Sequence, residues 1–163
     1  MRTVTIIGVL TLALALAACS TRHTIVTSSG TTTVETNAMH DTVKLTSGHG
    51  TAIIGRGAVD AAALGLPIYP GALPNATGGM AVQNSSGSSS QVSLQTDDNF
   101  DHVYQWYRQR MPNGSEQTHL VVKGGSVASF ELGALSDRDQ KSVVITESGG
   151  KTTILLTHVI KSD

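Results

Sequence analysis

The feature that most constrains the fold is a recurring pattern in which two runs of β-branched residues flank a short Ser/Gly segment. It occurs at 23–36, 42–54 and 142–156. Valine, isoleucine and threonine favour strands because branched side chains fit a pleated surface, whereas serine and glycine fit tight turns. Each copy therefore predicts a β-hairpin. The copies are unequally spaced and too few to stack as a solenoid, so we expect an antiparallel, β-rich protein.

One amphipathic helix is predicted at 99–111. Asp97 and Asp98 precede it, where carboxylates satisfy free amides and the helix dipole, and Pro112-Asn113-Gly114 ends it. At about 100° per residue, its apolar side chains share one face: Phe100, Val103, Tyr104, Tyr107 and Met111. Such a face is typical of a helix that packs on a sheet.

The predicted fold class is α+β, a mainly antiparallel β-sheet with this helix packed on one face, preceded by N-terminal β-hairpins. Further strands are expected near 80–83, 91–95, 119–123 and 127–132, with a serine-rich hairpin tip at 84–90. The expected organisation is a signal peptide (1–18), a lipidated cysteine and short tether (19–22), a hairpin region (23–57), a Pro/Gly-rich connector (58–79) and a β-β-α-β-β-β-β domain (80–163). Pro67 and Pro70 bracket Ile68 and Tyr69 in the connector, and we expect this pair to be buried.

The N-terminal segment predicts export. Arg2 is followed by an apolar stretch that ends at Ala18, which is typical of a secretory signal. The run Leu16-Ala17-Ala18-Cys19 resembles the bacterial lipobox. That resemblance implies cleavage before Cys19 and a diacylated thiol. It further implies anchoring in the bacterial cell membrane, with the outer membrane favoured in a two-membrane cell because Ser20, not aspartate, follows.

Two alternatives to the lipobox are an ordinary signal peptide cut near Ala18 and a short transmembrane anchor. The apolar stretch is shorter than the roughly 20 residues that span a bilayer, which disfavours the anchor. A second resemblance concerns 65–72, which reads Gly-x-Pro-x-Tyr-Pro-Gly-Ala, and the later helix ending at Pro112. Together they are similar to a group of exported, uncharacterised bacterial proteins, over about residues 52–132. This resemblance supplies no catalytic residues.

Charge and cysteine content exclude several classes of protein. The formal net charge is −1 at pH 7, so the positive field of a nucleic-acid binder is missing. Once Cys19 carries lipid, no thiol is left for a disulfide, a redox centre or a nucleophile. No serine stands in a Gly-x-Ser-x-Gly elbow, and no motif indicates a cofactor.

Two sets of side chains are candidate sites. His102, Trp106 and Arg110 are spaced four apart on the predicted helix, and this stripe suits a sugar ring, a peptidoglycan stem or a protein partner. The alternative is that Trp106 covers the sheet edge beneath Arg110. His40 and Asp41 form a metal site only if the hairpin brings His49 to them; otherwise they are solvated loop residues.

Three functional hypotheses follow. The first is a membrane-anchored, non-enzymatic binding or scaffolding lipoprotein with an envelope protein or glycan as partner. The second is an envelope metal-binding protein or hydrolase that uses the N-terminal histidines. The third is an assembly protein that pairs strands through the Thr-rich N-terminal hairpins, since exposed strand edges accept further strands.

Overall fold

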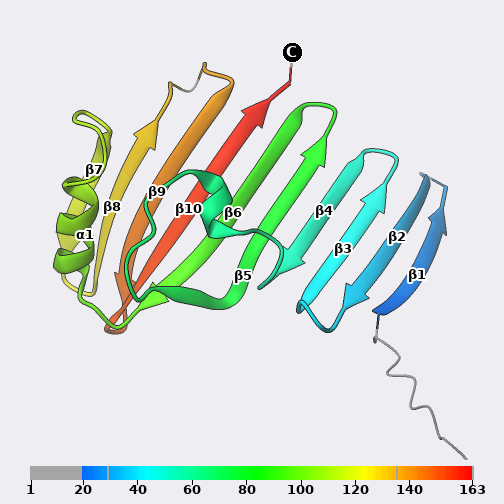
Figure 1. Cartoon of the computed structure of the whole chain (residues 1–163), viewed down its shortest axis with the longest axis horizontal. Helices are drawn as coiled ribbons and strands as arrows, with labels where there is room; N and C mark the ends of the chain where they lie inside the picture. Colours follow the sequence, from blue (N-terminus) through cyan, green and yellow to red (C-terminus); the bar gives the residue numbers. More distant parts are fainter. Residues whose placement is uncertain (1–19, 29, 135, 163) are drawn as a thin grey trace, which may run out of the picture.

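A computed structural model describes residues 20–28, 30–134 and 136–162. Ten strands form a single sheet in the order β1-β2-β3-β4-β5-β6-β10-β9-β8-β7 (Figure 1). Every neighbouring pair is antiparallel. The strands are β1 (Ser20–Thr27), β2 (Gly30–Asn37), β3 (Thr42–Ser47), β4 (Gly50–Gly55), β5 (Leu73–Asn84), β6 (Gly87–Thr96), β7 (Glu116–Val122), β8 (Gly125–Leu132), β9 (Asp139–Ser148) and β10 (Lys151–Lys161).

The three predicted hairpins are confirmed as β1–β2, β3–β4 and β9–β10. The predicted element order is also confirmed, because β5 and β6 precede the helix α1 (Phe100–Arg108) and β7 to β10 follow it. The described chain is therefore mostly antiparallel sheet with one α-helix. The N-terminal hairpins join the rest of the protein through the pairing of β4 with β5, so β1 to β4 continue the same sheet.

Helix α1 is shorter at both ends than 99–111. Its N-cap is Asn99, whose side-chain oxygen accepts a hydrogen bond from the His102 amide at 2.9 Å. The prediction that Asp97 and Asp98 cap the helix is wrong, because both carboxylates are engaged elsewhere. The Asp97 carboxylate lies 3.3 Å from the Lys151 ammonium, and that of Asp98 accepts a hydrogen bond from the Tyr69 hydroxyl at 2.6 Å.

The core lies between α1 and one face of the C-terminal half of the sheet. All five side chains of the predicted helix face are buried there, as expected. They pack with residues of the connector and of β6, β8, β9 and β10: Leu64, Leu66, Tyr69, Val92, Leu94, Ala128, Phe130, Val143, Ile145, Ile154 and Leu156. None of the buried apolar residues of the described chain lies in β1 to β4. The sheet thus has a covered half and an uncovered half.

The connector crosses the same face of the sheet as α1 (Figure 1). It contains a short 3₁₀ helix, η1 (Ala61–Leu64), that contacts β6 and β10. Tyr69 is buried as predicted, but the expectation for Ile68 is wrong, since its side chain is 38% exposed. Tyr69 is held against the helix by its edge-on contact with Trp106 and its hydrogen bond to the Asp98 carboxylate, whereas the Ile68 side chain stays partly exposed.

Several boundaries differ from those expected because strand pairing extends them. β1 begins at Ser20, so the residues expected as a tether pair with β2, with Arg22 opposite Glu35. β5 begins at Leu73, inside the expected connector, and its register shifts between Pro74 and Gly79. Only Ser85 and Ser86 of the serine-rich segment form the turn, because β6 starts at Gly87.

Candidate functional site

The predicted lipidation site, Cys19, lies outside the described residues. The described chain starts at the next residue, Ser20, which is already paired with Asn37 of β2.

The proposed metal set is not brought together. His40 and Asp41 lie in the turn before β3, whereas His49 lies in the turn after it. A six-residue strand separates its two ends by roughly 20 Å, so the hairpin does not bring His49 to His40 and Asp41. The Asp41 carboxylate instead lies 3.6 Å from the Arg56 guanidinium. In the described residues, no three His, Cys, Asp or Glu side chains are placed to share a metal ion.

The His102–Trp106–Arg110 stripe lies on the outer side of α1, but the Trp106 ring is in contact with other side chains of the protein. The Arg110 guanidinium lies 4.2 Å from the centre of the Trp106 ring and donates to the Trp106 carbonyl at 3.2 Å. Tyr69 and Tyr107 meet the same ring edge-on, at 5.4 and 4.8 Å between centroids. This geometry matches the alternative in which Trp106 is a packing residue beneath Arg110. A binding role for the stripe stays a prediction.

Tyrosine hydroxyls fix the connector and β7 to the helix. The Tyr107 hydroxyl donates to the Pro67 carbonyl at 3.0 Å, and burial raises its pKa. The hydrogen bond to the Asp98 carboxylate, together with burial, raises the pKa of Tyr69 to about 12. Burial and a hydrogen bond to Glu116 raise the pKa of Tyr104. All three tyrosines are therefore neutral hydrogen-bond donors near pH 7, which is typical of a structural role.

Two other histidines have defined partners. His158 lies on β10, and its ring nitrogen Nε2 is 2.8 Å from the Asp139 carboxylate. His119 of β7 stacks on Tyr104 with 4.0 Å between ring centroids. No local spacing in the sequence predicts this contact, because it depends on the register in which β7 pairs with β8.

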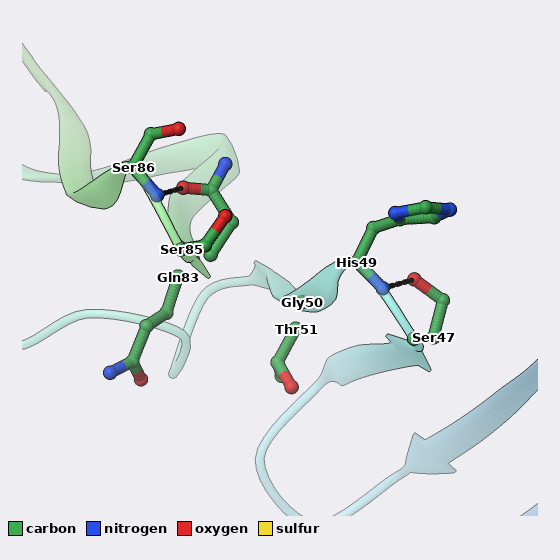
Figure 2. A pocket seen from close by; sticks show the side chains of 9 residues that line it. Ser47, His49, Gly50, Thr51, Gln83, Ser85 and Ser86 are labelled. Atoms are coloured by element: carbon green, nitrogen blue, oxygen red, sulfur yellow. Dashed lines mark hydrogen bonds between the residues drawn. The ribbon is translucent and has the colours of Figure 1, made fainter.

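An open, polar hollow of about 610 Å³ lies between the β3–β4 and β5–β6 turns. Figure 2 shows His49 on one side, with its amide bonded to the Ser47 hydroxyl, and Ser86 on the other, with its amide bonded to the Asn84 side chain. Both hydrogen bonds stay within their own turn, as in ordinary Asx-type and Ser-type turns. The lining residues offer hydroxyl and amide groups, and no lining side chain is Asp, Glu, Lys or Arg.

The most extensive feature is an apolar area on the sheet face opposite α1. Because side chains alternate along a strand, residues paired across strands share a face. Val34, Leu45, Ala52 and Val82 stand in one row across β2 to β5, and Val43, Ile54 and Met80 stand in the next. We call these seven residues the uncovered patch. None of the seven belongs to the buried core of the described chain, and Val43 and Ile54 are 37% and 42% exposed.

The opposite face of β1 to β3 carries charged side chains. Arg22, Glu35 and Lys44 stand in one row there, and Arg22 and Glu35 are ion-paired at 3.3 Å. The row continues to Ile53 of β4 and Ala81 of β5. An alternation of Val43, Lys44 and Leu45 in the sequence signalled this two-faced character. That alternation alone does not predict an exposed apolar area, because a single strand does not reveal whether its apolar face will be covered.

A scan against protein-family models, a search of curated proteins and a search of solved structures each found no match to this chain. No helix in the described part of the chain is long and apolar enough to cross a membrane.

Proposed function

We propose that this protein is an exported, lipid-anchored scaffolding or binding protein of the bacterial envelope, without enzymatic activity. Lipid on Cys19 holds the N-terminal end of the sheet at a membrane, and the sheet itself is the working surface. Envelope proteins or glycans are the partner class.

The observation that carries this proposal is the uncovered half of the sheet. β1 to β4 extend it by four strands that contribute nothing to the buried core of the described chain. Antiparallel sheets with one apolar and one polar face usually pack the apolar face against another layer. The chain keeps these strands regular, with eight paired positions between β1 and β2, so they are built as a surface for another molecule.

The short distance between Cys19 and β1 also supports a scaffold. With strand pairing starting at Ser20, no flexible spacer separates the lipid position from the sheet. A lipid there would hold the sheet close to the bilayer surface, whereas a long linker would let the domain reach distant partners.

The test compares the natively expressed protein with a Cys19→Ala variant by intact mass and membrane fractionation. We expect a mass equal to residues 19–163 plus acyl groups, and loss of the variant from membranes, because a thioether-linked diacylglycerol supplies the anchor. An unmodified soluble wild-type product would rule out the lipid-anchored scaffold. A Ser20→Ala variant is the matched control and is expected to fractionate like wild type.

A further inference from the structure

The uncovered patch needs an occupant whose surface is apolar, flat and uncharged. From Gly30 in β2 to Asn84 in β5, the residues that share its face are Val, Leu, Ile, Met, Ala, Gly, Thr, Ser and Asn, with no ionisable side chain. Anionic lipid surfaces attract proteins through Lys and Arg clusters, and this face of β2 to β5 offers none. A second copy of the patch meets all three requirements.

Symmetry makes the lack of charge decisive. In a two-fold interface both copies use the same patch. A charged side chain near the two-fold axis would therefore lie opposite the same charge on the other copy. The opposite face, which carries Arg22, Glu35 and Lys44, would be unsuitable for such a contact. The patch therefore suits contact with a second copy, because it lacks the charged side chains that the opposite face carries.

The whole face is large enough for a stable interface, although the patch alone is not. With strands about 4.8 Å apart and about 3.4 Å per residue, the four strands of the patch cover about 500 Å², and all ten cover about 1,400 Å². A stable interface needs about 800 Å² per partner. Leu155, Val144 and Val127 continue the same face across β10, β9 and β8, so overlap beyond the patch remains partly apolar. The charged residues of this extended face, Glu131, Lys151 and Lys161, stand at or near the strand ends, away from the patch.

We propose that two copies of this protein stack their sheets face to face through the uncovered patch, which forms a two-layer β-sandwich with α1 on the outside of each layer. Stacked sheets lie about 10 Å apart, so the side chains of the two patches interdigitate. The partner in the scaffolding function proposed above is thus a second copy of the chain. Only the location of this dimer at a membrane rests on that proposed function.

The test is the mass of the full-length protein, extracted in mild detergent and measured by sedimentation equilibrium with density-matched detergent. We expect two chains for wild type and one for Ile54→Lys, because a symmetric contact would bury the new ammonium group twice, and we expect at least about 100-fold weaker association. Thr46→Lys lies on the opposite face of the adjacent strand and is the matched control, expected to stay at two chains. Single chains for wild type at tens of micromolar, or two chains for Ile54→Lys, would overturn the proposal.

Crosslinking gives a second test. It uses cysteine variants that change the protein little, so the result does not depend on whether the fold tolerates a lysine at position 54. Ala52→Cys and Thr51→Cys place thiols on opposite faces of β4, in adjacent residues. With a bismaleimide of about 10 Å reach, matched to the sheet spacing, we expect a band of twice the chain mass for Ala52→Cys in intact membranes and little for Thr51→Cys. Equal yields for both, or an adduct of another mass at Ala52→Cys, would contradict stacking of two copies.

The two proposals fail separately. If the protein carries no lipid, the anchored function is lost, and the same sedimentation measurement in buffer without detergent still decides the dimer. If the lipid is present but the chain is single in detergent and does not crosslink through Ala52→Cys, the anchor stands and the stacked dimer is excluded.

Discussion

At the residue scale, the tyrosines of α1 do most to join the parts of the covered half. The Tyr107 side chain is 0% exposed, and its ring lies 6.4 Å from that of Phe130 on β8. Its hydroxyl reaches the Pro67 carbonyl in the connector. One side chain therefore connects helix, sheet and connector, and the predicted helix face identified it correctly from local periodicity.

We expect Tyr107→Ala to lower the free energy of unfolding by about 3–5 kcal/mol, because it leaves a large cavity and an unpaired carbonyl. Tyr107→Phe is the matched control and should cost only about 1 kcal/mol, since it removes the hydrogen bond alone. Urea denaturation followed by circular dichroism measures both. A loss below 1 kcal/mol for the alanine variant would show that the ring is not part of the core.

At the element scale, the hairpins depend on glycines where strands begin and end. Gly55 ends β4 with φ of 133°, a backbone conformation that L side chains rarely adopt, and a Cβ there would collide with the Asp41 carbonyl. Gly48, in the β3–β4 turn, has open space around its Cα. The two positions are both turn-associated glycines in the sequence, and only the tertiary structure distinguishes them.

We expect Gly55→Ala to open the β3–β4 pairing locally, because the collision is with backbone and cannot be relieved by a rotamer change. Amide hydrogen exchange within 42–55 should be at least about ten-fold faster than in wild type, while exchange in β9 and β10 stays unchanged. Gly48→Ala is the control, with exchange close to that of wild type. Unchanged exchange in Gly55→Ala would mean that the strand end adapts without loss of pairing.

At the scale of the whole molecule, stability is distributed unevenly along the sheet. β10 lies in the interior of the sheet between β6 and β9 and buries Ile154 and Leu156, whereas β1 is an edge strand with all eight residues exposed. β7 is the edge strand at the other end, but it packs His119 against Tyr104 of α1. The two edges therefore differ in what lies beside them.

We expect native-state hydrogen exchange to rank these strands, with β1 fastest, β7 intermediate and β10 slowest. Pairing alone leaves a strand marginal, and burial of apolar side chains supplies most of the opening free energy. The comparison of β1 with β7 isolates the effect of the helix because both are edge strands. Similar protection for β1 and β10 would show that the sheet unfolds as one cooperative unit.

The sequence by itself determined the strands, the three hairpins and the buried face of α1. These features follow from local chemistry: β-branched runs, turn residues and apolar spacing along a helix act over a few residues. The residues Phe100, Val103, Tyr104, Tyr107 and Met111 were placed correctly for that reason.

Only the tertiary structure decided which residues meet across strands. The separation of His40 from His49, the stacking of His119 on Tyr104 and the rows of the uncovered patch all depend on strand register, which joins residues distant in the chain. Likewise, only the packing decides that Tyr69 and Arg110 lie against the Trp106 ring, which the sequence left as one of two alternatives. Register and packing are settled by the sum of many long-range contacts, and no short stretch of sequence contains that sum.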